Sequence, residues 1–251
     1  MVQVHRFPGM MTESTKDNLI KDPWLSEMLG YNVYRVILDE TFIHGCGREG
    51  LESVKEGHVL LYSKVATDDL EGICFLQNSG FYLVDTNVVF KKEIAPGKSA
   101  VPFDRVRLAR KEDEEEIARI AGSSFRFSRF HLDVNIPDET ANRIKAEWTR
   151  NYFRGTRGDS MVVAEKGGEV TGFLQLIFGS AGALVIDLIA VGKENHKLGL
   201  ARDMVLYAEE NSGDFREIRV GTQIANTPSI QFYENIGFRY VSSQYIFHYT
   251  N

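Results

Sequence analysis

The sequence has 251 residues, of which 43% are hydrophobic and 25% are charged, and its formal net charge is −6. This size and composition are typical of a globular protein with one large domain or two small ones. Residues 1–100 carry 10 basic against 14 acidic side chains and residues 101–251 carry 19 against 21, which argues against a nucleic-acid partner.

Membrane, secretion and metal-site signals are weak throughout. No apolar run has the length of a membrane span, and the first residues lack the basic start and apolar core of a secretion signal. Cys46 and Cys74 show no metal-ligand spacing, although His44 lies close to Cys46. We therefore expect two unreactive thiols in a cytoplasmic protein with no metal and no membrane partner.

A sequence segment in the first part of the chain is repeated near the C-terminus. Asp69–Val84 reads DLEGICFLQNSGFYLV, and Asn226–Tyr240 reads NTPSIQFYENIGFRY. Aligning Ile73 with Ile230 also matches the later Asn, Gly-Phe, Val and Phe positions at one constant offset. We read residues 24–92 as a degenerate half-copy of a C-terminal strand–helix–strand module. A Gly-Phe pair after a helix is common, however, so chance is the competing explanation.

Tyr233 stands in the second copy where the first has Leu76. A duplication that keeps the packing residues and changes one side chain points to a role for the Tyr233 hydroxyl. The alternative is that Tyr233, with Ile230 and Ile236, forms an apolar stripe in the core.

The boundary between two parts of the chain is predicted in residues 91–105, KKEIAPGKSAVPFDR. This segment is polar and contains two prolines and a glycine. We expect an N-terminal module at residues 1–92, a linker at 93–104 and a C-terminal domain at 105–251. Periodicity and turn signals in that domain predict the order β-α-α-β-β-β-loop-α-β-α-β, a mixed α/β sheet with helices. A capping box between Asp113 and Glu116 is expected to open the first helix.

A glycine-containing loop, VGKENHKLGLA, links the apolar strand ALVIDLIAV to the helix that starts near residue 200. Helix N-termini offer unpaired N–H groups and a partial positive charge, and small residues let a phosphate approach them. Gly199 and Ala201 are the small residues, and Lys193 and Lys197 add positive charge. Close packing is the competing explanation for such a motif.

These motifs together resemble the GNAT superfamily of acyl-CoA-dependent N-acyltransferases. The pyrophosphate motif Q/R-x-x-G-x-G/A corresponds to His196, Lys197, Leu198, Gly199, Leu200 and Ala201, with His196 as the departure. The resemblance implies a GNAT fold over residues 105–249, a mixed central sheet flanked by helices, and acetyl-CoA as the acyl donor. It places Asn226 at the donor's edge and Tyr233 near the thioester sulfur.

A narrower resemblance links FRFSRFHLDVNIPDETANRIKAEWTRNYFRG to the TDP-fucosamine acetyltransferases, which also carry a truncated GNAT-like N-terminal half. It implies a small-molecule amine acceptor, a nucleotide-linked amino-deoxy sugar, for which Arg129 would bind phosphate and His131 a hydroxyl or the amine. A surface ion pair for Arg129 and a structural role for His131 are the alternatives. The oligomeric state is open, and a homodimer is one option.

Acyl transfer needs a proton donor for the leaving thiolate, a polarised carbonyl and an unprotonated amine. A phenol stays protonated at neutral pH, which makes Tyr233 the candidate acid. The backbone N–H groups of Ile189 or Val191 are expected to polarise the carbonyl. Asp187, Glu165 or a water chain would take the amine proton. Acetylation of a protein N-terminus, a lysine or a small amine, and non-catalytic acyl-CoA binding, are the rival functions.

Overall fold

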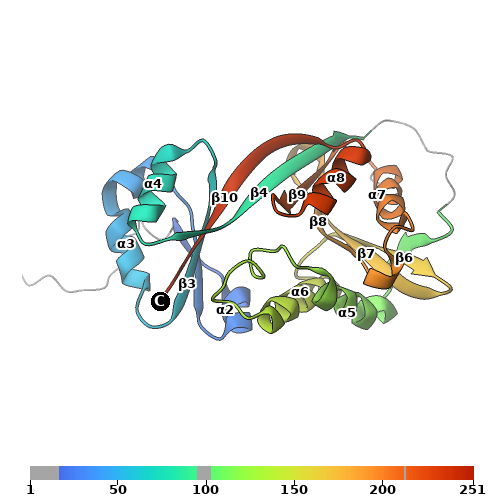
Figure 1. Cartoon of the computed structure of the whole chain (residues 1–251), viewed down its shortest axis with the longest axis horizontal. Coiled ribbons are helices and arrows are strands. Elements are labelled where there is room, and N and C mark those ends of the chain that lie inside the picture. The colour runs from blue at the N-terminus through green and yellow to red at the C-terminus, as the bar shows by residue number, and fades with distance from the viewer. Residues whose placement is uncertain (1–16, 95–102, 212) are drawn as a thin grey trace, which may run out of the picture. The chain divides into compact units, whose positions relative to one another are not determined.

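A computed structural model describes residues 17–94, 103–211 and 213–251 (Figure 1). The chain divides into two units: the first comprises the described residues up to Thr86 together with Ser243–Asn251, and the second those of Asn87–Ser242. The division therefore runs through two long strands, β4 (Tyr82–Glu93) and β10 (Arg239–Thr250).

This division differs from the predicted boundaries at 93–104. The joint between the units lies ahead of that segment, and the end of β10 belongs to the first unit. The reason is strand pairing: the second half of β4 pairs with a C-terminal strand, and the second half of β10 pairs with an N-terminal strand. Residues 95–102 of the predicted linker lie outside the described residues.

The first unit is a small sheet with helices. Strand β2 (Asn32–Val36) lies between β1 (Leu19–Lys21), antiparallel, and β3 (Val59–Ala66), parallel, and β3 pairs antiparallel with the second half of β10. Its helical segments are α2 (Pro23–Leu29), the π-helical turn η1 (Phe42–Cys46), α3 (Gly47–Val54) and α4 (Leu70–Asn78). The core gathers apolar side chains from these elements, among them Phe42, Leu51, Leu61, Leu76 and Phe247.

The second unit contains a larger sheet, in the order β4, β9, β8, β7, β6, β5. Neighbours are antiparallel except β8 and β9, which are parallel. The strands are β5 (Val106–Leu108), β6 (Ser160–Lys166), β7 (Glu169–Phe178), β8 (Ala183–Val191) and β9 (Glu217–Gln223). The helices are α5 (Glu114–Ser124), α6 (Asp138–Phe153), α7 (Leu200–Glu210) and α8 (Thr227–Asn235), with the 3-10 turns η2 (Lys111–Asp113), η3 (Ser180–Gly182) and η4 (Lys193–Asn195).

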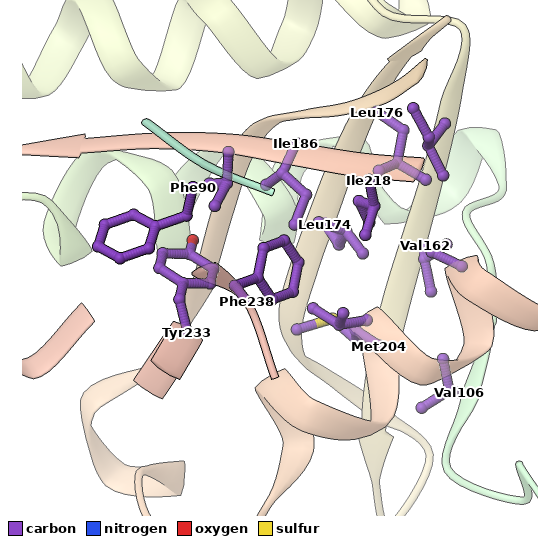
Figure 2. Close-up of a cluster of buried hydrophobic side chains, with 14 of the residues drawn as sticks. Phe90, Val106, Val162, Leu174, Leu176, Ile186, Met204, Ile218, Tyr233 and Phe238 are labelled. Carbon is purple, nitrogen blue, oxygen red and sulfur yellow. The ribbon is translucent and has the colours of Figure 1, made fainter. Parts of the chain in front are cut away.

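Helices cover both faces of this sheet: α5 and α6 lie on one face, and α7 and α8 on the other (Figure 1). Side chains alternate along a strand, so β6 sends Met161 and Val163 toward α5 and α6, and Val162 and Ala164 toward α7 and α8. Figure 2 shows the cluster on the α7/α8 face, which includes Met204 and Tyr233. A mixed sheet flanked by helices, the predicted fold class, is confirmed, as is the predicted order of elements.

The internal repeat is visible in the structure. One constant offset in residue number relates helix α4 to helix α8 at both ends (70 to 227, and 78 to 235), and it also relates β4 to β10 (82 to 239, and 93 to 250). Both helices have a side-chain cap at an equivalent residue, Asp69 accepting from the N–H of Gly72 and Asn226 from that of Ser229.

The same offset relates Gly80 to Gly237, the glycines that follow the two helices. They have φ of 85° and 93°. Glycine adopts this left-handed conformation without strain, which explains its presence in both copies.

The long strands of the two copies exchange partners. Strand β4 follows α4 but pairs with β9, starting at Asn87 opposite Gln223. Strand β10 follows α8 but pairs with β3, starting at Gln244 opposite Ala66. The offset of the repeat converts one register into the other, since it takes position 87 to 244 and position 66 to 223. Each unit is therefore completed by a strand from the other copy of the repeat.

One local prediction is wrong. Asp113 forms no capping box with Glu116, because its carboxylate accepts hydrogen bonds from the backbone N–H of Arg110, at 2.6 Å, and from the Arg107 guanidinium, at 2.7 and 2.9 Å. Arg107 lowers the pKa of Asp113, with the Arg110 hydrogen bond acting in the same direction. The residue thus ties the start of α5 to β5 instead of capping the helix.

Candidate functional site

Strands β8 and β9 separate partway along their length. They pair from Ala183 opposite Glu217 to Ile186 opposite Val220, and β8 then continues to Val191 with no further β9 partner. At the same point β8 contains a bulge, since Ile186 faces Leu176 and Leu188 faces Gln175, which leaves Asp187 without a partner on β7. The sheet therefore presents an open backbone edge from residue 187 onward.

The open edge presents the N–H groups of Ile189 and Val191. Backbone N–H groups of a strand alternate between its two edges. Gly192 donates its N–H to Thr171 O of β7, at 2.8 Å. The N–H groups of Val191 and Ile189, one and three residues earlier, therefore point to the opposite edge, where β9 has separated. Both side chains pack against the cluster that contains Leu200 and Tyr233.

The loop after β8 leads this edge into the N-terminus of α7. Gly199 precedes the helix with φ of 80°, a conformation that favours glycine, and a Cβ there would meet no atom within 4 Å. The residue is thus required by its backbone conformation and leaves open space beside it. The residues of the predicted motif, His196 to Gly199, are exposed, and Leu200 is buried beneath them. Ala201 follows in the first turn, half-buried.

His196 connects the loop to the open edge. Its Nε2 lies 2.9 Å from Val191 O, so in this tautomer the ring donates to the strand's last carbonyl. Lys197 adopts φ of 64°, which is unusual for a residue with a Cβ. Across the loop, Arg105 contacts Leu198 O at 3.4 Å and Asp203 of α7 at 2.5 Å. The loop is held at both ends while its middle remains exposed.

Tyr233 lies in the core on the α7/α8 face, with an exposed fraction of 3%. Its ring packs against Phe90, Phe232 and Phe238, at centroid distances of 6.3, 5.1 and 5.4 Å, and Figure 2 shows it between Phe90 and Phe238. Its hydroxyl makes no hydrogen bond within the described part of the chain. Burial raises the pKa of the Tyr233 phenol, which keeps it protonated at neutral pH.

Asn226 caps α8 next to the end of β9. Its Oδ1 accepts from Ser229 N at 3.3 Å, and its Nδ2 lies 3.4 Å from the Thr222 hydroxyl. The side chain is half-buried, so one side of the amide still meets solvent. Asn226, Tyr233, the open edge and the α7 N-terminus thus lie on elements that share one face of the sheet.

The two candidate bases are both held by arginines. Asp187 accepts from Arg157 Nε at 2.8 Å and Nη2 at 2.6 Å, and also from Trp148 Nε1 at 2.9 Å and Gln175 Nε2 at 3.2 Å. Glu165 accepts from Arg107 at 2.5 and 2.8 Å. Both carboxylates therefore have an arginine, and not solvent, as their principal hydrogen-bonding partner.

The predicted acceptor-binding residues lie between α5 and α6, on the other face of the sheet. Arg129 stacks its guanidinium over the Phe130 ring, at 4.6 Å. Both ring nitrogens of His131 are engaged, Nδ1 with Ser128 Oγ at 2.6 Å and Nε2 with Asn142 Oδ1 at 3.0 Å. Burial lowers the pKa of His131. The acceptor-binding roles of Arg129 and His131 both stay predictions.

The sequence analysis missed a polar cluster on this face, formed by Arg157, Gln175 and Trp148 around Asp187. Arg157 stacks over the Trp148 ring at 4.4 Å, and Trp148 packs edge-on against Phe130 at 6.3 Å. The available signal was an arginine between Gly155 and Gly158, directly after α6. Such glycines mark positions where the backbone is sharply turned, with φ of 70° and 89° here.

The described ranges 17–94, 103–211 and 213–251 contain no grouping of three or more His, Cys, Asp or Glu side chains suited to a metal ion. Their helices are all too short or too polar to cross a membrane. Cys46 is half-buried and Cys74 is exposed, and the two do not form a disulfide bond.

Comparison with known proteins identifies the family of the second unit. Residues 116–238 match the model of the acetyltransferase (GNAT) family. The chain is also 33% identical over 149 residues to the spore coat polysaccharide biosynthesis protein SpsD of Bacillus subtilis (strain 168). That match covers 59% of this chain and 51% of the relative, so the chain spans about half the length of the curated relative it matches.

Solved structures show the same fold over most of the chain. A GCN5-related N-acetyltransferase from Sphaerobacter thermophilus superposes with a TM-score of 0.59 at 12% identity, covering 87% of this chain and 72% of that one. A tandem GNAT protein from the clavulanic acid biosynthesis pathway superposes with a TM-score of 0.55 at 14% identity, covering 87% and 75%. At these identities the likeness is one of fold alone.

Proposed function

Since residues 116–238 belong to the acetyltransferase (GNAT) family, we propose that this protein transfers an acetyl group from acetyl-CoA to a primary amine. The observation that carries the proposal is the open edge of β8 beside the N-terminus of α7. Two backbone N–H groups, an exposed glycine-containing loop and a buried phenol lie on this face, which is the set of groups that acyl transfer from a thioester requires.

The α7 N-terminus and its loop would hold the donor's pyrophosphate. Gly199, Leu200 and Ala201 supply the helix-terminal N–H groups, and the left-handed conformation of Gly199 exposes them. Lys193 and Lys197 are exposed beside them and add positive charge. The N–H groups of Ile189 and Val191 on the open edge would bind the donor's amide-containing arm and polarise its carbonyl. Asn226 would contact it at the end of β9.

The chemistry that acetyl-CoA supplies is a reactive thioester with a thiolate leaving group. Burial raises the pKa of the Tyr233 phenol, so Oη carries a proton at neutral pH, and this is the proton that we propose for the leaving thiolate. Asp187 and Glu165 form ion pairs with Arg157 and Arg107. Removal of the amine proton is therefore assigned to water rather than to either carboxylate.

The acceptor that we propose is the amino group of a nucleotide-linked amino-deoxy sugar. The support is the 33% identity to a protein of spore coat polysaccharide biosynthesis and the resemblance of residues 125–155 to enzymes that acetylate such sugars. The protein has a net charge of −6, so its overall charge does not attract an anionic acceptor. Recognition of the acceptor's phosphates must therefore come from individual basic side chains.

The test is thiol release from acetyl-CoA by the full chain, with a panel of thymidine- and uridine-diphosphate amino sugars, polyamines and peptides. Tyr233→Phe keeps the ring and removes the hydroxyl. Tyr207→Phe is the matched control, because Tyr207 packs against the same cluster and against Phe103, with ring centroids 5.3 Å apart. We expect amine-dependent turnover on an amino sugar that falls at least about 100-fold in Tyr233→Phe and is unchanged in Tyr207→Phe.

Other outcomes separate the rival functions. Turnover on peptides or polyamines alone would keep the acetyltransferase and reject the sugar nucleotide. Binding of acetyl-CoA without turnover on any amine would reject catalysis in favour of an acyl-CoA-binding protein. Full activity of Tyr233→Phe would assign the residue to the core, like Leu76 in the other copy.

A further inference from the structure

Arg157 is held in one orientation by three contacts. Its guanidinium forms two parallel hydrogen bonds to Asp187, and its flat face lies over the Trp148 ring at 4.4 Å. Asp187 in turn is fixed by Trp148 Nε1 and Gln175 Nε2 and has a side-chain exposure of 9%. A guanidinium bound in this way has already lost its rotational freedom, so a ligand that binds it need not supply that ordering.

The backbone around Arg157 is built for this orientation. Arg157 N donates to Asn151 O at 3.2 Å, and Asp159 N donates to Leu176 O at 2.8 Å, which anchors the loop to α6 and to β7. Gly158 has φ of 89°, and a Cβ on it would lie 2.9 Å from Gln175 Nε2. Glycine is therefore needed there both for its conformation and for the close approach of the loop to the sheet.

Arg157 still has unused hydrogen-bonding capacity, and its side chain is partly exposed. A guanidinium has five N–H donors, and Asp187 uses one on Nε and one on Nη2. Within the residues that the structure describes, Arg157 makes no other side-chain hydrogen bond, and its side chain is 39% exposed. Both donors of Nη1 and the second donor of Nη2 are thus available to an oxyanion.

The neighbourhood of Arg157 also contains an unpaired buried acceptor. Gln175 is fully buried, and its Oε1 has no hydrogen-bond partner among the described residues. An unpaired buried polar atom is costly, and a bound water or a functional role are among its known explanations.

The position of Arg157 relates it to the acceptor. Asp187, its partner, is the first residue of β8 beyond the last pair with β9, so Arg157 lies where the sheet opens. The donor-binding features are on the α7/α8 face, and Arg157 is on the α5/α6 face with Trp148. An amine that reaches a thioester held in the opening must approach from the face that the donor leaves free.

We propose that Arg157 is the anion-binding residue of the acceptor site and takes a phosphate oxygen pair of the acceptor. The proposal rests on the function proposed above and specifies its substrate class as a phosphorylated amine, such as a sugar nucleotide. The phosphate of such a sugar is attached to the same ring as the amine, so one fixed guanidinium both selects the substrate and sets the position of the amine.

The experiment measures binding of thymidine diphosphate to the full chain by calorimetry, with coenzyme A at saturation so that the donor site is filled. We expect Arg157→Gln to weaken this binding at least about 10-fold, the loss typical of one charged hydrogen-bonding group. Arg154→Gln is the matched control, because Arg154 lies three residues earlier, is 50% exposed and pairs with Glu147 instead. It should bind thymidine diphosphate as the wild type does.

Two further variants protect the test against misfolding. Arg157→Gln leaves the Asp187 carboxylate unpaired, so Arg157→Gln combined with Asp187→Asn removes both charges together. Arg157→Lys keeps the charge without the two-pronged geometry and should recover only part of the affinity. In turnover, the same variants should raise KM for a sugar nucleotide about 10-fold while leaving KM for the free amino sugar unchanged.

The proposal would be overturned if the folded double variant bound thymidine diphosphate with wild-type affinity. It would also be overturned if the wild type acetylated amines without a phosphate group and did not bind thymidine diphosphate. Both results leave acetyl-CoA-dependent turnover intact and so leave the proposed function standing. Absence of coenzyme A binding to the wild type would instead reject the proposed function itself.

Discussion

Leu76 and Tyr233 occupy equivalent positions in the two copies of the repeat, related by the offset that takes α4 to α8, and both are buried, with exposed fractions of 0% and 3%. The position is therefore a packing position in both copies. Leucine satisfies it in α4 without a polar atom. The hydroxyl of Tyr233 adds nothing that packing requires, which is why its effect on turnover and on stability can be separated.

Titration of Tyr233 should make the protein sensitive to alkaline pH. A phenol in the unfolded chain ionises at about pH 10, while burial raises the pKa of Tyr233 in the folded state. The contribution of Tyr233 to the free energy of unfolding is complete below about pH 10 and is lost as the pH rises toward the folded pKa. Urea unfolding of wild type and Tyr233→Phe at about pH 9 and about pH 11 should show the wild type losing stability relative to the variant. A constant difference would mean that the phenol is solvated.

Gly199→Ala should weaken acetyl-CoA binding beyond its effect on stability. A Cβ at φ of 80° costs about 1 kcal/mol, although it would contact nothing. Gly167→Ala is the matched control, since Gly167 has φ of 62°, is equally free of contacts and lies in the turn between β6 and β7. Calorimetry with acetyl-CoA should give weaker binding for Gly199→Ala only. Equal affinities for the two variants would remove the loop from the donor site.

The two helix caps offer a paired test of the repeat. Asp69→Ala should reduce the free energy of unfolding by about 1 kcal/mol, and Asn226→Ala by less, because the Asn226 cap is longer, 3.3 Å against 2.9 Å. Only Asn226→Ala should also weaken acetyl-CoA binding. If Asp69→Ala weakened that binding equally, the effect of Asn226→Ala would be attributable to stability.

The exchange of strands predicts that core mutations act in the opposite half of the chain. Phe90 and Phe247 are equivalent by the repeat and are 3% and 2% exposed. Phe247→Ala should destabilise the first unit, and Phe90→Ala the second, each by about 3–5 kcal/mol.

Hydrogen exchange would report this directly. Phe247→Ala should speed exchange in Leu60–Ala66 of β3, and Phe90→Ala in Glu217–Gln223 of β9. Destabilisation confined to the variant's own end of the sequence would contradict the pairing.

Much of the architecture followed from local patterns. Two apolar runs, at residues 160–165 and 169–178, with a glycine-containing turn between them predicted the hairpin of β6 and β7, and the segment at residues 227–237 was predicted as the helix that is α8. The constant offset between the copies predicted a strand, a helix and a strand in the first copy, in the order that β3, α4 and β4 follow. These features are set by residues close together in the chain, which is why sequence spacing could reveal them.

The sequence by itself thus determined the fold class, the repeat, the glycine loop before α7 and the change from Leu76 to Tyr233. Only the tertiary structure decided which strands pair across the repeat and that Asp187 forms an ion pair with Arg157. Which side chains or strands become partners depends on contacts between residues that are far apart in the chain. Arg157 and Asp187 are one example, and the pairs of β4 with β9 and of β10 with β3 join residues at a much greater separation. No periodicity in the sequence encodes such contacts.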